Sequence, residues 1–234
     1  MTEQYGYDAL ASEYYDSFHR TCRNFDETTV NVLTDRPVTI PAEGLVLDVG
    51  CGRGCCVEFL GVDAQRIVQL DSSRKMLELQ DREPCCLRIH ADATDMPLLD
   101  GQFIAVVGFL IDPFIGLNLF SEVFRLLRGG GVFFASTPTL EWGLSLRNAL
   151  AMDASSARFL TKHQETVIVP STLIRAEKLD EMLTHTGFQD IQVTSHCLPR
   201  TANQISPDIQ CVAEEREIEV YELPIIHLIS AKKP

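Results

Sequence analysis

The chain has 234 residues, of which 45% are hydrophobic and 23% are charged, and its formal net charge is −13. These values are typical of one globular domain that buries its own core. Nucleic acids and anionic membranes attract basic surfaces, so an acidic chain with scattered Lys and Arg predicts neither as a partner. No apolar run approaches the roughly 18–20 residues that cross a bilayer, and residues 1–5 do not resemble a secretory signal. We therefore expect a cytoplasmic protein.

Eight cysteines are present, but their spacing argues against disulfides and against a metal site. Two pairs are adjacent in sequence, at 55–56 and 85–86. No two cysteines have the two-residue separation of a zinc knuckle or a redox motif. We expect reduced thiols that pack as small apolar side chains, and no bound metal.

The pattern of apolar side chains in residues 1–40 predicts a helical cap on the main domain. Aromatic and apolar side chains recur at i, i+3, i+7 and i+11, which places Tyr7, Leu10, Tyr14 and Phe18 on one helical face. A second helix is expected from Phe25 to Leu33 before two prolines break the chain. So short a segment must pack on the main domain to bury its aromatic rings.

Residues 45–54 read Leu-Val-Leu-Asp-Val-Gly-Cys-Gly-Arg-Gly. The apolar run predicts a strand buried on both faces, and the glycines let the backbone turn sharply and approach a ligand closely. A helix predicted from Cys55 to Leu60 would present its free amides to that ligand. Strand, glycine turn and helix start together predict a cradle for a small molecule.

Strand and helix signals alternate through the rest of the chain. Further strands are expected at 66–71, 86–92, 103–110, 132–135, 191–195 and 225–231. Helices are expected after Ser72 or Ser73, along a stripe of Leu117, Phe120, Phe124 and Leu127 that ends at glycines 129–131, and from Ala176 to Thr186 before Gly187. This alternation predicts an α/β fold, Rossmann-like and doubly wound around a mostly parallel seven-stranded sheet.

The alternation of strand and helix signals stops after Pro138. We therefore expect residues 139–172 to form a lid insertion, with a helix from Leu144 to Met152. Residues 45–138 and 173–232 are the expected core of a single domain that spans residues 1–234. A Glu-rich stretch around Pro207 is predicted to be a solvated loop.

Ligands of such sheets bind beyond the carboxyl ends of the strands. Four acids, Asp48, Asp71, Asp92 and Asp112, fall at or just after predicted strand ends, so they converge on one rim. A dinucleotide fingerprint needs a third glycine where Cys55 stands, and a phosphate-binding P-loop needs a Lys that the turn lacks. A nicotinamide-dependent oxidoreductase therefore stays only as a lesser alternative.

The pattern Asp-x-Gly-x-Gly-x-Gly of residues 48–54 resembles the first motif of the class I S-adenosylmethionine-dependent methyltransferases. Segments 71–77, 91–97 and 124–131 are similar to three later motifs of that family, and residues 7–16 resemble the opening helix of its small-molecule members. The resemblance covers residues 5–137 strongly and 173–232 loosely. Ile104 departs from it, because the family usually has an Asp there.

The resemblance implies S-adenosylmethionine as cofactor. Gly50 and Gly52 would bring backbone amides near its methionyl part, and Asp48 would hold the loop. Asp71 would accept hydrogen bonds from both ribose hydroxyls, a geometry that suits a carboxylate. Asp92 would accept from the adenine amino group. The remaining residues that the resemblance places at the cofactor are Cys51, Gly54, Ser72, Met76, Ala93 and Phe109.

The implied activity is methyl transfer to an oxygen or nitrogen nucleophile of a small molecule or short peptide. A hydroxyl acceptor gains from a general base, and the candidates are His19 in the cap, His163 in the lid and Asp112 after the fourth strand. Trp142 and the cap tyrosines either shape an acceptor pocket or pack the lid on the cap. A non-catalytic protein of the same fold, binding the cofactor or a partner, stays open as an alternative.

Overall fold

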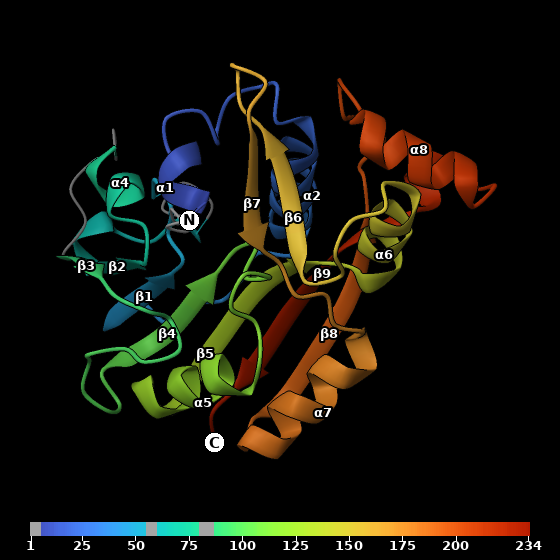
Figure 1. The fold of residues 1–234 in the computed structure, drawn as a ribbon. Helices are drawn as coiled ribbons and strands as arrows, with labels where there is room; N and C mark the ends of the chain where they lie inside the picture. The colour runs from blue at the N-terminus through green and yellow to red at the C-terminus, as the bar shows by residue number, and fades with distance from the viewer. Residues whose placement is uncertain (1–5, 55–59, 80–86) are drawn as a thin grey trace.

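The computed structural model describes residues 6–54, 60–79 and 87–234, and a seven-stranded sheet dominates it (Figure 1). The strand order is β3-β2-β1-β4-β5-β9-β8. Strands β1 to β5 pair in parallel, whereas β9 runs antiparallel to both of its neighbours. The bounds are β1 Leu45–Val49, β2 Ile67–Asp71, β3 Leu87–His90, β4 Phe103–Gly108, β5 Leu127–Pro138, β8 Gln189–Cys197 and β9 Pro224–Lys232. The predicted mostly parallel sheet is confirmed.

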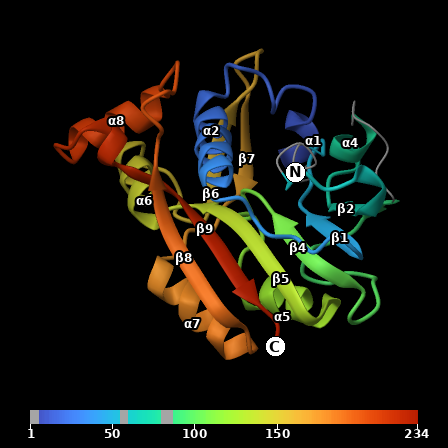
Figure 2. The ribbon, with the colours of Figure 1, turned by 180° about the vertical axis from the view of Figure 1, so that it is seen from behind.

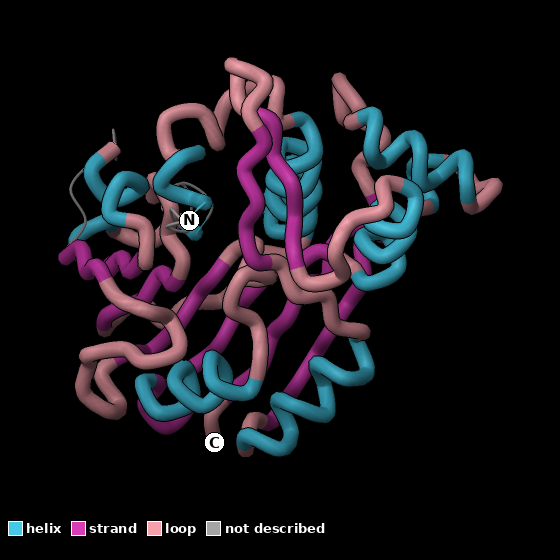
Figure 3. The backbone as a smooth tube through the Cα atoms, viewed as in Figure 1, coloured by secondary structure: helices cyan, strands magenta, loops and turns pink. Residues whose placement is uncertain are grey.

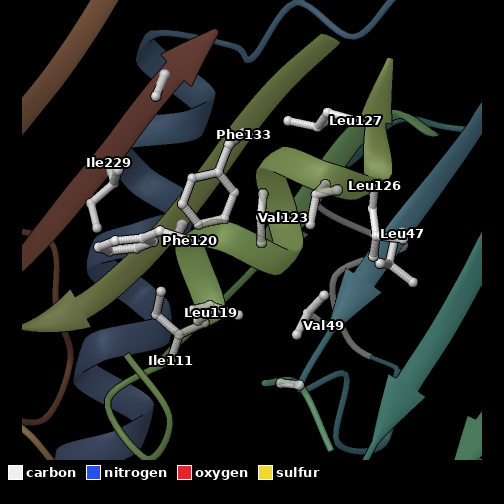
Figure 4. Close-up of a cluster of buried hydrophobic side chains, with 14 of the residues drawn as sticks. Leu47, Val49, Ile111, Leu119, Phe120, Val123, Leu126, Leu127, Phe133 and Ile229 are labelled. Atoms are coloured by element: carbon white, nitrogen blue, oxygen red, sulfur yellow. The ribbon is translucent and has the colours of Figure 1, made fainter. Parts of the chain in front are cut away.

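Helices α5 (Leu117–Leu126) and α7 (Ala176–Thr186) cover one face of the sheet, where the largest apolar cluster forms (Figures 1 and 4). Helix α5 buries Leu119, Phe120, Val123 and Leu126, which share a helical face. The predicted stripe was wrong at both ends, since Leu117 is 43% exposed and Leu127 already begins β5. Helix α7 ends as predicted at Gly187, whose φ of +106° satisfies a left-handed cap.

A smaller apolar cluster on β1, β2 and β4 contains Val46, Ile67, Ala105 and Val107. Burial on both faces explains why β1 and β4 read as continuous apolar runs. The helix predicted from Cys55 lies outside the described residues, apart from Leu60. Ser73 caps α4 (Arg74–Glu78) as expected, because its hydroxyl accepts from the amide of Met76 at 3.2 Å.

The cap and the lid stand together at one end of the sheet (Figures 1 and 3). The cap comprises α1 (Gly6–Leu10) and α2 (Arg20–Asp35), so its first helix is shorter than predicted and its second is longer. The lid comprises α6 (Leu140–Ala149) and a hairpin of β6 (Ser156–Leu160) and β7 (Thr166–Pro170). Seen from behind, α2 lies between α8 and α1 (Figure 2).

The stretch predicted as a solvated loop instead forms α8 (Pro207–Glu215), followed by the short helix η2 (Val220–Glu222). Ser206 caps α8, and Pro207 occupies its first turn, where no amide is needed. Ile209, Val212 and Ala213 are buried in a further apolar cluster with Phe25, Trp142 and strand β9. The many glutamates in this stretch are typical of a solvated loop, so the apolar face of α8 was not predicted. A second short helix, η1, spans Ala64–Arg66.

Within the described residues, every helix is too short or too polar to cross a membrane.

Candidate functional site: a glycine cradle and a neighbouring cavity

The glycine turn after β1 is held by the neighbouring strand. The amides of Gly50 and Cys51 both donate to the carbonyl of Leu70, at 2.8 and 3.1 Å, and the amide of Gly54 donates to Cys51. All three glycines have positive φ, at +67° for Gly50, +53° for Gly52 and +82° for Gly54. Only glycine adopts such a series without strain, so the turn requires the residues that define its motif.

Two aromatic side chains lie over this turn. A Cβ on Gly50 would stand 2.6 Å from the ring of Phe114, and a Cβ on Gly52 would collide with the Tyr15 hydroxyl. That hydroxyl also accepts a hydrogen bond from the amide of Arg53 at 3.2 Å. Neither residue was predicted at the turn, because only the fold brings them to it. The aromatic richness of the cap was the only signal for Tyr15.

Asp71 at the end of β2 closes the cradle. One carboxylate oxygen accepts from the amide of Gly52 at 2.8 Å and the other from the amide of Ser73 at 2.7 Å. Burial raises the pKa of Asp71, and these two backbone hydrogen bonds counteract the rise. Each oxygen keeps a second lone pair, so the residue can still accept from two adjacent hydroxyls. This geometry fits the predicted ribose contact.

Asp92 follows β3 and is exposed, with one oxygen accepting from the amide and the hydroxyl of Thr94, each at 2.7 Å. The amide of Ala91 donates to the carbonyl of Asp71 at 3.2 Å, which joins the ends of β2 and β3. The two acids therefore lie on one rim of the sheet, as predicted. Ala93 is buried beside them at 5% exposure.

The other residues predicted at the cofactor lie around the same rim. Asp48 and Met76 are buried, each with 2% of its surface exposed. Ser72 is exposed, and its carbonyl bonds the ring of His90 at 3.0 Å. Phe109 packs beside the apolar cluster of β1, β2 and β4.

A separate cavity of about 350 Å³ lies where the cap, the lid and the start of α8 meet. Aromatic rings from the cap and the lid form much of its wall, and Asp112 and Arg147 supply its buried charges. The wall includes Tyr7, Tyr14, Phe25, Trp142, Phe159 and His19. This cavity was not predicted as a unit, because its lining comes from segments far apart in the sequence.

Asp112 is 8% exposed, and burial raises its pKa to about 6, although the Ser171 side chain and the Arg147 charge oppose the rise. Arg147 donates to the hydroxyl of Ser171 at 2.7 Å and to its carbonyl at 3.0 Å. Thr172 donates its amide to the carbonyl of Asp112 at 2.8 Å. The lid residues therefore hold Asp112 in place at the cavity wall.

Tyr14 and Tyr15 connect the cavity with the cradle, because their ring centroids are 5.0 Å apart, Tyr14 lines the cavity and Tyr15 covers Gly52. Burial, then the Asp112 carboxylate, then Cys22 and Asp71 hold the pKa of Tyr7 well above its ordinary value. The phenol of Tyr7 therefore stays protonated at neutral pH. Of the three predicted bases, His19 and Asp112 line the cavity, whereas His163 is exposed in the turn between β6 and β7.

Among the described residues, no three His, Cys, Asp or Glu side chains gather closely enough to hold a metal ion. The described cysteines, at 22, 51, 197 and 211, are free thiols. The adjacent pairs at 55–56 and 85–86 lie outside the described residues.

Comparison with known proteins matches residues 46–131 to the family model described as a methyltransferase domain. The chain is 31% identical over 129 residues to a demethylmenaquinone methyltransferase of Clavibacter sepedonicus, a match covering 51% of each chain. It is 26% identical over 214 residues to a tRNA U34 carboxymethyltransferase of Vibrio cholerae, covering 81% of this chain and 62% of that one. The chain thus spans less than two thirds of either relative.

Solved structures share the whole fold at low identity. The protein bound to the Trm112 methyltransferase activator of Haloferax volcanii has a TM-score of 0.70 at 17% identity, with 99% of both chains covered. Phosphoethanolamine N-methyltransferase 2 of Haemonchus contortus, solved with S-adenosyl-L-methionine, has a TM-score of 0.62 at 15% identity, covering 99% of this chain and 60% of that one. Family model, relatives and fold agree: residues 46–131 match a methyltransferase domain, and the chain as a whole has the Rossmann-like fold of the class I S-adenosylmethionine-dependent methyltransferases.

Proposed function

We propose that this protein transfers a methyl group from S-adenosylmethionine to an oxygen or nitrogen atom of a small molecule held in the cavity between cap and lid. The observation that carries the proposal is the pairing of two sites. A glycine cradle with strand-end acids lies beside a partly open cavity: Tyr15 covers Gly52 in the cradle, and its ring centroid lies 5.0 Å from that of Tyr14 in the cavity wall. An enzyme that joins two substrates needs both sites side by side.

The cradle residues fit the cofactor. Asp71 would accept from the ribose hydroxyls, Asp92 would accept from the adenine amino group, and the turn from Gly50 to Gly54 would face the methionyl part. A Cβ at Gly50 or Gly52 would collide with the rings that cover the turn. Only glycine therefore lets another group approach the backbone this closely. Tyr15 and Phe114 would then be walls of the cofactor site.

S-adenosylmethionine supplies a methyl group that its sulfonium has already activated for displacement. The protein's own part is to orient the acceptor, exclude water and remove a proton where the acceptor is a hydroxyl. Asp112 is the first candidate for the base that accepts that proton, since its carboxylate lines the cavity and its pKa of about 6 leaves it ionised at neutral pH. His19 is the second candidate, and the exposed His163 is the third.

A small-molecule acceptor is favoured over a nucleic acid. The relative from Clavibacter sepedonicus is named for a small molecule, whereas the one from Vibrio cholerae is named for tRNA. A tRNA substrate needs Lys and Arg at its phosphates, and this chain has a net charge of −13. A cavity of about 350 Å³ also lies within the usual range for small-molecule sites, roughly 300–1,000 Å³.

Methyl-labelled cofactor incubated with cell extract tests the proposal directly. The extract is separated beforehand into small-molecule, protein and RNA fractions, and each is offered to the full chain and to its Asp71→Ala variant. We expect label in the small-molecule fraction with the parent protein and far less with the variant. Label in RNA alone would overturn the acceptor class. Cofactor binding without label in any fraction would favour the non-catalytic alternative, and binding of NAD in preference would favour an oxidoreductase.

A further inference from the structure

The segment that joins β3 to β4 runs beside α5 and lies outside the seven-stranded sheet (Figure 1). It opens with a tight turn over residues 92–95, in which the amide of Asp95 donates to the carbonyl of Asp92 at 3.2 Å. Thr94 donates twice to Oδ1 of Asp92, so the carboxylate moves with the turn. Because the turn has no strand beside it to fix its position, other groups must bind its backbone.

Two charged side chains of α5 bind the backbone that follows this turn. Oε2 of Glu122 accepts from the amide of Met96 at 2.7 Å, and Arg125 donates to the carbonyl of Met96 at 2.9 Å. Arg125 also donates to the carbonyl of Leu98 at 2.7 Å. Both polar groups of the Met96 backbone are therefore bound by α5.

Arg125 uses every N–H of its guanidinium group in this arrangement. Nε and Nη2 donate to the two carboxylate oxygens of Glu122, at 2.8 and 2.7 Å, while Nη2 also binds Met96. Nη1 donates to Asp100 at 2.8 Å in addition to Leu98. A guanidinium has five donors in one rigid plane, so a side chain that satisfies all five is fixed in one orientation.

The other end of the turn is anchored to the end of β2. The amide of Ala91 donates to the carbonyl of Asp71 at 3.2 Å. Ala93 and Met96 are 5% and 3% exposed and belong to the same apolar cluster as α5. Only residues 92–95 lie between the two anchors, so a displacement of Met96 changes the direction of the carboxylate that the turn carries.

A comparison within the chain shows that the pair on α5 differs from an ordinary surface ion pair. Lys178 and Glu181 on α7 have the same i, i+3 spacing, at 2.8 Å, but their side chains are 61% and 66% exposed. The side chains of Arg125 and Glu122 are 29% and 17% exposed, and they bind the backbone of another segment. The pair on α5 is therefore built to hold that segment.

We propose that Arg125, oriented by Glu122, is a positioning residue for the cofactor: it holds the turn of residues 92–95 so that Asp92 selects the amino group of adenine. This role rests on the proposed function, which assigns the adenine amino group to Asp92. Arg125 acts through the backbone of Met96 and Leu98. It thus extends the determinants of cofactor selection from the rim of the sheet to a helix on its face.

Two ligands that differ only at position 6 of the purine measure this selection. S-adenosylhomocysteine has an amino group there, and S-inosylhomocysteine has a carbonyl oxygen. The Asp92 carboxylate accepts from the amino group and repels the carbonyl oxygen, so the full parent chain should bind S-adenosylhomocysteine at least about tenfold more tightly in calorimetry. A parent chain that binds both ligands equally would overturn the inference.

The Arg125→Lys variant keeps the positive charge and loses the planar fork, so it isolates the geometry of the clamp. We expect its preference for S-adenosylhomocysteine to fall to less than about threefold, because the turn is no longer held in one position. Circular dichroism on the same samples verifies that the variant is folded. Equal loss of affinity for both ligands, with the preference kept, would show that Arg125 only supports the fold and would overturn its positioning role.

The matched control is Glu181→Gln, which breaks the exposed i, i+3 pair on α7. It should change neither affinity, and a loss of preference in this control would contradict the assignment to α5.

The Glu122→Gln variant is milder and provides a readout that needs no ligand. Hydrogen exchange should become at least about tenfold faster at the amide of Met96, which loses its carboxylate acceptor. Exchange at the amide of Gly50, which donates to Leu70, should not change. Unchanged exchange at Met96 would overturn the clamp even if Arg125→Lys does not fold.

Failure of this role and failure of the proposed function give different results. If the parent chain binds S-adenosylhomocysteine and every variant keeps the preference, the positioning role fails and the proposed function stands. If Arg125→Lys loses the preference but cell extract is never methylated, methyl transfer fails and the positioning role stands. If the folded parent chain binds neither ligand, the cofactor site fails and the positioning role fails with it.

Discussion

The cradle and the cavity are built in opposite ways. The cradle is made mostly of backbone from two short stretches, residues 50–54 and 69–73, whose hydrogen bonds join neighbouring parallel strands. The cavity is made of side chains from the cap, the segment after β4, the lid and the start of α8. A site made of local backbone can be recognised from a motif. A site assembled by packing depends on the whole fold and tolerates other side chains, which lets a family keep one cofactor and change acceptors.

The largest expected effect is on the packing that supports the cavity. Ile209 in α8 is fully buried, so Ile209→Ala removes apolar contacts and leaves a void. We expect the free energy of unfolding to fall by about 2–5 kcal/mol. Chemical denaturation measures the change. The exposed Cys211 on the same helix is the control, and Cys211→Ala should stay within about 0.5 kcal/mol of the parent. Similar stabilities of the two variants would show that α8 is not part of the core.

The next effect is a pH dependence of the free energy of unfolding, which arises from Asp112 in the cavity wall. Burial raises the pKa of Asp112 to about 6, so the folded protein keeps a proton that the unfolded chain releases near pH 4. Since the folded state binds more protons over this interval, the free energy of unfolding falls as pH rises from about 4 to about 6. Relative to Asp112→Asn, the parent should lose about 2–3 kcal/mol across that window.

Denaturation of both proteins at pH 4, 5, 6 and 7 measures this difference. The groups around the carboxyl are Tyr7 from α1, Cys22 from α2, Arg147 from α6 and Ser171 after β7, and all four are present in the variant. A constant difference at every pH would contradict the raised pKa of Asp112.

The cradle can be broken without touching the cavity. Gly52 and Gly61 both have positive φ, at +53° and +59°, but only Gly52 has a side chain where its Cβ would go. Gly52→Ala and Gly61→Ala should each cost about 1–2 kcal/mol of stability from backbone strain, and Gly52→Ala should cost more in total because its Cβ also collides with the Tyr15 hydroxyl. Only Gly52→Ala should also weaken S-adenosylhomocysteine binding, by at least about tenfold, as calorimetry would show. An equal affinity of both variants would remove the turn from the cofactor site.

The positions of the glycine turn and of the strand-end acid could be predicted because these residues follow strands that are recognisable by themselves. The turn at Gly50 follows β1, whereas the acid at Asp71 and the cap at Ser73 lie at the end of β2 and just after it, and the structure brings the turn and the acid into hydrogen-bond contact. The sheet was predictable for the same reason, since buried parallel strands read as apolar runs.

The cavity could not be predicted in this way, because no local pattern joins residues from separate segments. Tyr15 and Phe114 cover the turn through tertiary contacts alone. Helix α8 was missed because glutamates between Ile209 and the following strand outweighed a modest apolar stripe. Its cap, Ser206-Pro207-Asp208, was visible and would have corrected the prediction.

The smallest expected effect distinguishes an Asp that contacts the cofactor from an Asp that only caps a short helix. Asp71 and Asp63 each accept a backbone hydrogen bond beside a short helix, at 2.8 Å from Gly52 and 2.9 Å from Gln65. Asp71→Ala should weaken S-adenosylhomocysteine binding by at least about tenfold, equivalent to about 1.4 kcal/mol, because it removes both acceptors for the ribose. Asp63→Ala should leave that affinity unchanged. Equal affinities of the two variants would assign Asp71 to capping alone.

The central claim is that the glycine cradle holds S-adenosylmethionine. Isothermal calorimetry of the full, folded chain with S-adenosylhomocysteine tests it most directly. We expect saturable binding of one molecule per chain, and unchanged binding in the Trp142→Phe variant, which alters the separate cavity. Absence of binding to folded protein would contradict the account.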